Sequence, residues 1–83
     1  MSMTFKEELE NSLIPAIKRM IENESAHLEM LKKYQAKHTN GFLDFILKTD
    51  VEKMIIVSQA YLTHLEERLD DYVKYAENLN STL

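Results

Sequence analysis

The chain has 83 residues with one Gly, one Pro, no Cys and a formal net charge of −4, so we expect a single domain, 1–83, with no disulfides and little room for the turns of a β-sheet. The negative charge disfavours nucleic acid as a partner. No apolar run reaches the length of a membrane span, and the N-terminus lacks the apolar core of a signal peptide, so the sequence predicts a cytoplasmic protein with no membrane partner.

A first helix is predicted to begin after Thr4. Thr4 and Glu7 have the spacing of a capping box, in which the hydroxyl accepts a hydrogen bond from a backbone amide and the carboxylate reaches back to the cap. Further along, Pro15 has no amide hydrogen, and its ring clashes with the carbonyl four residues before it. We therefore expect a kink or a break between Asn11 and Pro15, although Pro15 could equally be the first-turn residue of a second helix.

From Pro15 to His38 the pattern is helical again, with an apolar stripe at Ile17, Ile21, Leu28 and Leu31. Gly41, the single glycine, lies where a left-handed residue would end this helix. The segment 42–48 that follows, FLDFILK, is apolar on nearly every side. We expect it to form a short helix that lies across the end of a hairpin and closes the core.

The stretch from Thr49 to Leu79 predicts one long helix, which a second capping box at Thr49 and Glu52 would begin. Its inward positions alternate in steps of four and three, the heptad spacing of a helix that packs lengthwise against another helix. These positions are Val51, Ile55, Ser58, Leu62, Leu65, Leu69, Tyr72, Ala76 and Leu79. The sequence therefore predicts an all-α fold, an antiparallel helical hairpin with a short connecting helix.

The long helix carries more apolar surface than one neighbour can cover. Met54, Ile55, Ile56 and Val57 are consecutive, so on a helix they point in four directions about 100° apart. Soluble proteins rarely leave large apolar patches in water, which favours a homodimer that forms a four-helix bundle. The alternative is a monomeric three-helix bundle in which 42–48 covers the whole band. The predicted interface consists of Phe42, Phe45, Ile46, Met54, Ile56, Val57 and Tyr61.

One pair has the spacing of a metal-binding motif. Glu24 and His27 are three residues apart, so both could reach one ion from the same helix face, as in the di-metal sites of helical bundles. A hairpin register that places Gln35 near Lys53 would also bring His64 and Glu67 close to this pair. A bundle that binds iron, manganese or zinc through Glu24, His27 and His64 is therefore the alternative function.

Charge is uneven along the chain. Residues 1–41 carry six basic and six acidic side chains, so the whole net charge lies in 42–83. Its densest acidic patch is a solvated face or, alternatively, a docking site for a basic partner. In the register above, Lys18 and Arg19 would partly neutralise this patch, which consists of Glu66, Glu67, Asp70 and Asp71.

Residues typical of catalysis are scarce, because the chain has no Cys nucleophile and no Gly-rich phosphate loop. Val57-Ser58-Gln59, in a helical hairpin of this length, is similar to a few residues of the small aspartyl-phosphate phosphatases of sporulating bacteria. That family carries Ser-Gln-x-Leu-Asp, whereas here Ala60, Tyr61 and Leu62 follow, so its catalytic acid has no counterpart and no activity is implied. We expect a non-catalytic, homodimeric module that binds or regulates another protein and needs no cofactor.

Overall fold

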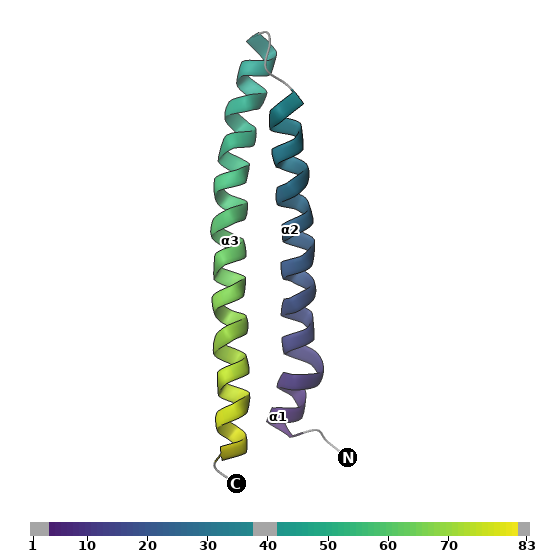
Figure 1. Ribbon diagram of the computed structural model, residues 1–83, viewed down its shortest axis with the longest axis vertical. Coiled ribbons are helices and arrows are strands. Elements are labelled where there is room, and N and C mark those ends of the chain that lie inside the picture. Colours follow the sequence, from purple (N-terminus) through teal and green to yellow (C-terminus); the bar gives the residue numbers. More distant parts are fainter. Residues whose placement is uncertain (1–3, 38–41, 82–83) are drawn as a thin grey trace.

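Two long antiparallel helices form a hairpin in the computed structural model, which describes residues 4–37 and 42–81 and the side chains of 4–36 and 46–79 (Figure 1). In chain order the elements are α1 (Phe5–Glu8), the π-helix η1 (Leu9–Leu13), α2 (Ile14–Lys37) and α3 (Phe42–Ser81). Every element in the described residues is helical, which confirms the predicted all-α hairpin. The predicted stop at Gly41 lies outside the described residues.

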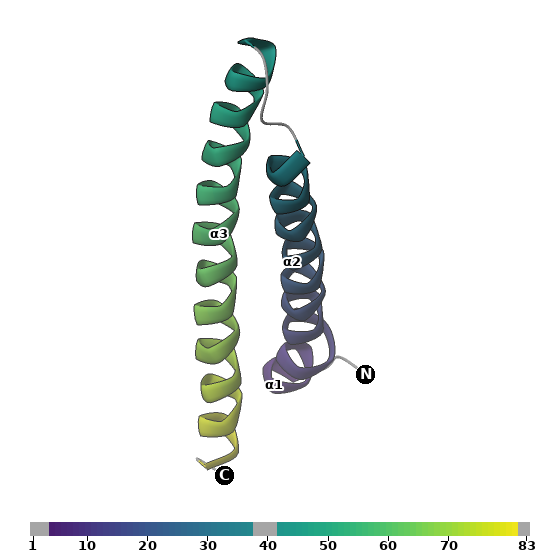
Figure 2. The same ribbon diagram turned by 45° about the horizontal axis from the view of Figure 1, so that its top comes forward.

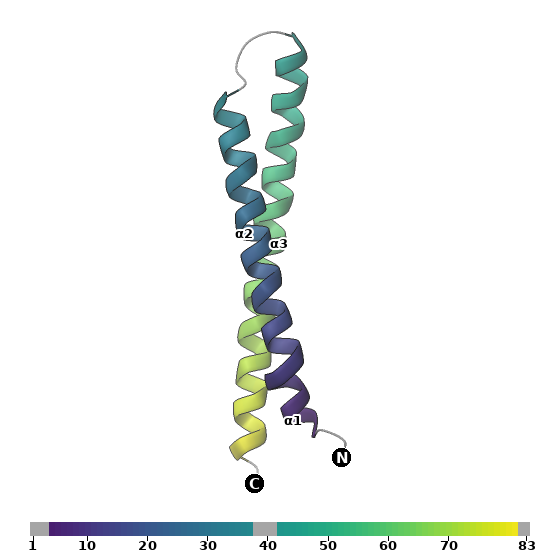
Figure 3. The same ribbon diagram turned by 90° about the vertical axis from the view of Figure 1, so that its right-hand side faces the viewer.

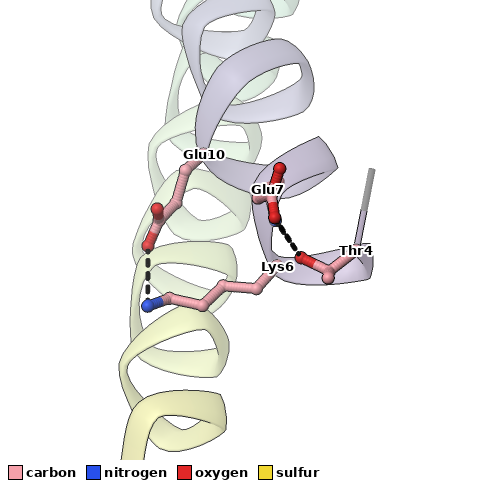
Figure 4. Close-up of polar contacts among 4 residues, drawn as sticks. All are labelled: Thr4, Lys6, Glu7 and Glu10. Carbon is pink, nitrogen blue, oxygen red and sulfur yellow. Dashed lines mark hydrogen bonds and ion pairs between the residues drawn. The ribbon is translucent and has the colours of Figure 1, made fainter. Parts of the chain in front are cut away.

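The chain enters its first helix through the predicted cap. The backbone amide of Glu7 donates to Thr4 Oγ1 at 3.2 Å, and the Thr4 hydroxyl also lies 3.2 Å from Glu7 Oε1, to which it can donate (Figure 4). Lys6 Nζ lies 3.6 Å from Oε1 of Glu10, which is one turn further along the helix. These local contacts start the helix at the end of the hairpin where α1 lies beside the C-terminal part of α3 (Figures 1 and 2).

The predicted break before Pro15 takes the form of a wide helical turn. In η1 the amide of Ile14 donates to the carbonyl of Leu9, five residues back, instead of the usual four. The extra residue rotates everything before it by about 100° relative to α2. As a result Leu9, which a regular helix would turn away from α3, is only 2% exposed and belongs to the core.

The prediction of a separate short helix at 42–48 is wrong. α3 is one helix of 40 residues, so this segment continues directly into the long helix, and Thr49 and Glu52 lie inside the helix instead of capping it. An apolar segment with good helix formers has no reason to break where a helical continuation follows without Gly or Pro. The connection between the helices is therefore shorter than expected, which changes the pairing of α2 with α3.

The core is a single row of contacts between the two helices. Near the turn, Leu28 and Leu31 of α2 pack with Val51 and Ile55 of α3. At the other end, the buried side chains of Leu9, Ile14 and Ala76 form a second cluster, and the rings of Phe5 and Tyr75 meet edge to face at 5.8 Å. Every predicted heptad position of α3 is buried or half-buried, and those of α2 are likewise at Ile17, Ile21, Leu28 and Leu31.

The hairpin is long and thin. Its extents are 63 × 21 × 14 Å, and its radius of gyration is 18.6 Å, whereas a compact domain of this length would have about 12 Å. The helices cross over one another at a shallow inclination (Figure 3). Because each helix has one helical neighbour in the described structure, much of its circumference faces solvent.

Candidate functional site

A large part of the apolar side-chain surface is exposed. Among the described side chains, nine hydrophobic residues are buried, but twelve large ones are exposed. On α3 the most exposed include Met54 at 53% and Val57 at 67%. An excess of this size distinguishes the hairpin from an ordinary soluble surface, on which apolar residues occur singly.

These exposed residues follow a second heptad row on α3. Met54, Val57 and Tyr61 each precede a residue of the core row by one position, so they lie about 100° round the helix from it. We call the positions that precede a core residue by one the outer row. On α3 the outer row consists of Asp50, Met54, Val57, Tyr61, His64, Arg68, Asp71, Tyr75 and Asn78, with Leu47 one turn before Asp50, and all of these are exposed.

The same rule defines an outer row on α2. Met20 precedes the core residue Ile21, and Met30 precedes Leu31; their side chains are 42% and 57% exposed. The sequence prediction missed this half of the surface, although the one-residue offset was visible in the sequence. The outer row of α2, together with the last residue of η1, is Leu13, Ala16, Met20, Asn23, His27, Met30 and Tyr34.

Both outer rows lie on the same side of the hairpin. A shallow groove near the middle is lined by His27 of α2 and by Met54, Val57 and Tyr61 of α3. A second groove, near the chain ends, joins Leu13 to residues around Tyr75. Because the two rows line common grooves at two levels, they belong to the same side of the hairpin, which we call the apolar face.

One polar contact between the helices lies under this face. Ser58 Oγ donates to Glu24 Oε1 at 2.5 Å, and His27 Nδ1 lies 3.4 Å from the same oxygen. The Glu24 side chain is 19% exposed, while that of His27 is 48% exposed and lines the central groove. Ser58 occupies a core position of α3. At this level of the core a polar contact between Ser58 and Glu24 therefore replaces the apolar contact found at the other levels.

The hydrogen bond from Ser58 holds the pKa of Glu24 below its ordinary value. Burial acts in the opposite direction, and the contact with His27 adds a smaller lowering of the pKa. A hydrogen bond to the ionised carboxylate stabilises the charged form, which is why Ser58 has the largest influence. Glu24 is therefore an ionised group of the hairpin at neutral pH.

The predicted approach of His64 and Glu67 to Glu24 and His27 is wrong. Glu24 meets Ser58, six residues before His64, which corresponds to about 9 Å along α3. The shift follows from the short connection, because a helix that begins at Phe42 pairs with α2 earlier than one that begins at Thr49. Among the described residues no group of three or more His, Cys, Asp or Glu is placed to hold a metal ion.

The predicted interface residues fall into three groups: those in or near the outer row, one on another side of α3, and two whose side chains lie outside the described part. Met54, Val57 and Tyr61 belong to the outer row, and Ile46, 44% exposed, lies close to it. Ile56 is 65% exposed but precedes no core residue and points to another side of α3. Phe42 and Phe45 lie in α3, with side chains outside the described part.

Two carboxylates of the acidic patch, Asp70 and Asp71, form ion pairs with basic side chains of α3 itself. Asp70 Oδ2 lies 2.9 Å from Lys74 Nζ, and Arg68 donates to Asp71 at 3.4 Å. Hydrogen bonding and attraction to Asp70 raise the pKa of Lys74. The prediction that Lys18 and Arg19 neutralise Asp70 and Asp71 depended on the pairing of Gln35 with Lys53. That is the same pairing that wrongly placed His64 near Glu24. All four acidic residues are exposed.

Comparison with known proteins gives no relationship from which a function could be transferred: no family model matches the chain, and no curated protein or solved structure matches it either. None of the described helices combines the length and apolarity that crossing a membrane requires.

Proposed function

We propose that this chain is a small, non-catalytic helical module that acts as a homodimer and binds or regulates another protein. The observation that carries the proposal is the apolar face, which extends over both helices and holds most of the exposed large hydrophobic residues. In a four-helix bundle each helix has two neighbours, so each needs two apolar rows. α2 and α3 both have two such rows, and the hairpin covers only one of them.

The opposite side of the hairpin suits a partner of a different kind. Glu52, Glu66 and Asp70 lie on the side of α3 away from the outer row and are exposed. A dimer that covers the apolar face leaves these carboxylates in water, where they would attract a basic surface on a partner protein. We propose a cytoplasmic location as well, because a chain without Cys is suited to a reducing compartment.

The experiment that tests the proposal is a mass measurement. Multi-angle light scattering at micromolar concentration should give twice the chain mass of 9.8 kDa. Val57→Asp should shift the mass toward that of one chain, because it introduces a charge into the apolar face. Glu66→Gln, on the opposite side, is the control and should keep the mass of the dimer. A monomer at every concentration would contradict the proposal.

A further inference from the structure

The outer row of α3 carries charges of opposite sign on the two sides of its middle. Asp50 and Arg68 both lie in this row and are exposed, and Asp71, the next residue of the row, is paired with Arg68 within the chain at 3.4 Å. They are nine positions before and nine positions after residue 59, which lies midway between Val57 and Tyr61. If a second α3 packs on this row in the opposite direction about that midpoint, each Asp50 faces Arg68 of the second copy. In the same arrangement Val57 faces Tyr61, and Met54 faces His64.

The outer row of α2 has a midpoint of its own, at Asn23. Ala16 and Met30 are seven positions to either side, so an antiparallel second α2 would place the small residue against the large one. Asn23 would meet Asn23 of the second copy. Its amide can donate and accept, so the two side chains can pair, and an Asn in an apolar row is a known determinant of helix register.

The two midpoints lie at the same level of the hairpin. The hydrogen bond from Ser58 to Glu24 places residue 58 of α3 beside residue 24 of α2. Because the helices are antiparallel, residue 59 then lies beside residue 23. One two-fold axis can therefore pass through both midpoints, as a symmetric dimer requires. The charge pattern of α3 and the size pattern of α2 thus place the axis independently at the same position.

We infer that a second copy of this chain covers the apolar face end for end, with the turns of the two hairpins at opposite ends of a four-helix bundle. The inference rests on the proposed homodimer and specifies its arrangement. In the other two-fold arrangement, with both turns at one end, α3 would face α2 of the second copy. Asp50 would then lie near Met30 and Tyr34, and Arg68 near Leu13, so charges would be covered by apolar side chains, which is unfavourable.

Charge exchange tests the pairing. Asp50→Arg and Arg68→Asp should each raise the dissociation constant of the dimer at least tenfold, because each places like charges opposite one another. The double variant with both substitutions should recover most of the loss. Glu52→Arg makes the same charge change on the other side of α3 and should have little effect. Equal weakening by the single and double variants would overturn the inference.

Disulfide cross-linking tests the direction. The chain has no Cys, so each single variant has one thiol and can cross-link only between copies. A mixture of Met54→Cys and His64→Cys should form a mixed disulfide. Met54→Cys alone should not, because its two copies would be about 15 Å apart along the helix. A mixed disulfide of Met54→Cys with His27→Cys would instead indicate turns at the same end and overturn the inference.

Light scattering of the reduced mixtures separates the two proposals. If the variants are dimers but Met54→Cys and His64→Cys do not cross-link under oxidation, the arrangement is wrong and the homodimer stands. If the unmodified chain is a monomer, both proposals fail.

Discussion

The core row and the outer row of α3 run side by side, one residue apart, and have similar heptad spacing but opposite surroundings. Ile55 is 9% exposed, whereas Met54, the residue before it, is 53% exposed. Residue size does not separate the rows, since both contain large apolar side chains. The difference is the neighbour: α2 covers one row, and no part of the chain that the structure describes covers the other. A helix with two such rows is typical of a four-helix bundle.

The largest expected effect on stability comes from truncation of a buried side chain in the core row. Leu65 is 5% exposed, so Leu65→Ala removes buried apolar surface and leaves a cavity, at a cost of about 2–5 kcal/mol in the free energy of unfolding. For a domain of this size that loss lowers the melting temperature by many degrees or prevents folding. Thermal unfolding followed by circular dichroism measures it.

Glu66→Ala is the matched control, one position round the helix. Glu66 is exposed, so its removal should change the melting temperature little. Equal damage by the two substitutions would mean that residue 66 is buried and that the assignment of the core row is wrong.

A smaller, pH-dependent effect should follow from Ser58→Ala. The Ser58 hydroxyl lowers the pKa of Glu24 in the folded chain. The hydrogen bond therefore stabilises the fold fully at pH values above the ordinary pKa of a Glu, about 4.3. This stabilisation disappears as the pH falls through the lowered pKa, because the carboxylate becomes protonated. The melting temperatures of the wild type and Ser58→Ala should therefore differ most near neutral pH and converge in acid. Urea or thermal unfolding from pH 7 to pH 3 measures the difference.

Glu24→Gln should flatten the same part of the pH profile, since it removes the group that titrates. Glu22→Gln replaces an exposed carboxylate two residues away and should leave the profile unchanged. A constant difference between wild type and Ser58→Ala down to pH 3 would show that the contact does not depend on the charge of Glu24.

The smallest effect is expected at Pro15. Pro15→Ala restores an amide but also gives the unfolded chain more freedom, which costs about 0.4–1 kcal/mol. We expect η1 to persist, because a regular helix would turn Leu9 out of the core. The melting temperature should fall by a few degrees. A rise would mean that the helix becomes regular and that burial of Leu9 does not maintain the wide turn.

The sequence predicted the core row of α3, the hairpin and the cap at Thr4, because heptad spacing and cap residues are local patterns. It did not predict the pairing of the helices, which depends on where α3 begins. The segment 42–48 is equally compatible with a separate helix and with a continuation, so Glu24 was matched to His64 instead of Ser58. The outer row of α2 was not predicted, because Met20 and Met30 form no consecutive apolar run as long as Met54 to Val57 on α3.

The wide turn at Leu9–Leu13 can also be described as a tolerated insertion. A π-turn holds one residue more than a regular turn, so the heptad pattern is offset by one residue across it. The segment before the turn and the helix after it can therefore both direct apolar residues toward α3. Loss of one residue from within 10–13 would convert the turn to a regular helix and leave Leu9 facing α3. The same loss from the middle of α2 would rotate half of that helix by about 100° and exchange its core row for another face. Residues 10–13 are therefore a part of the hairpin that can lose one residue without disturbing the core.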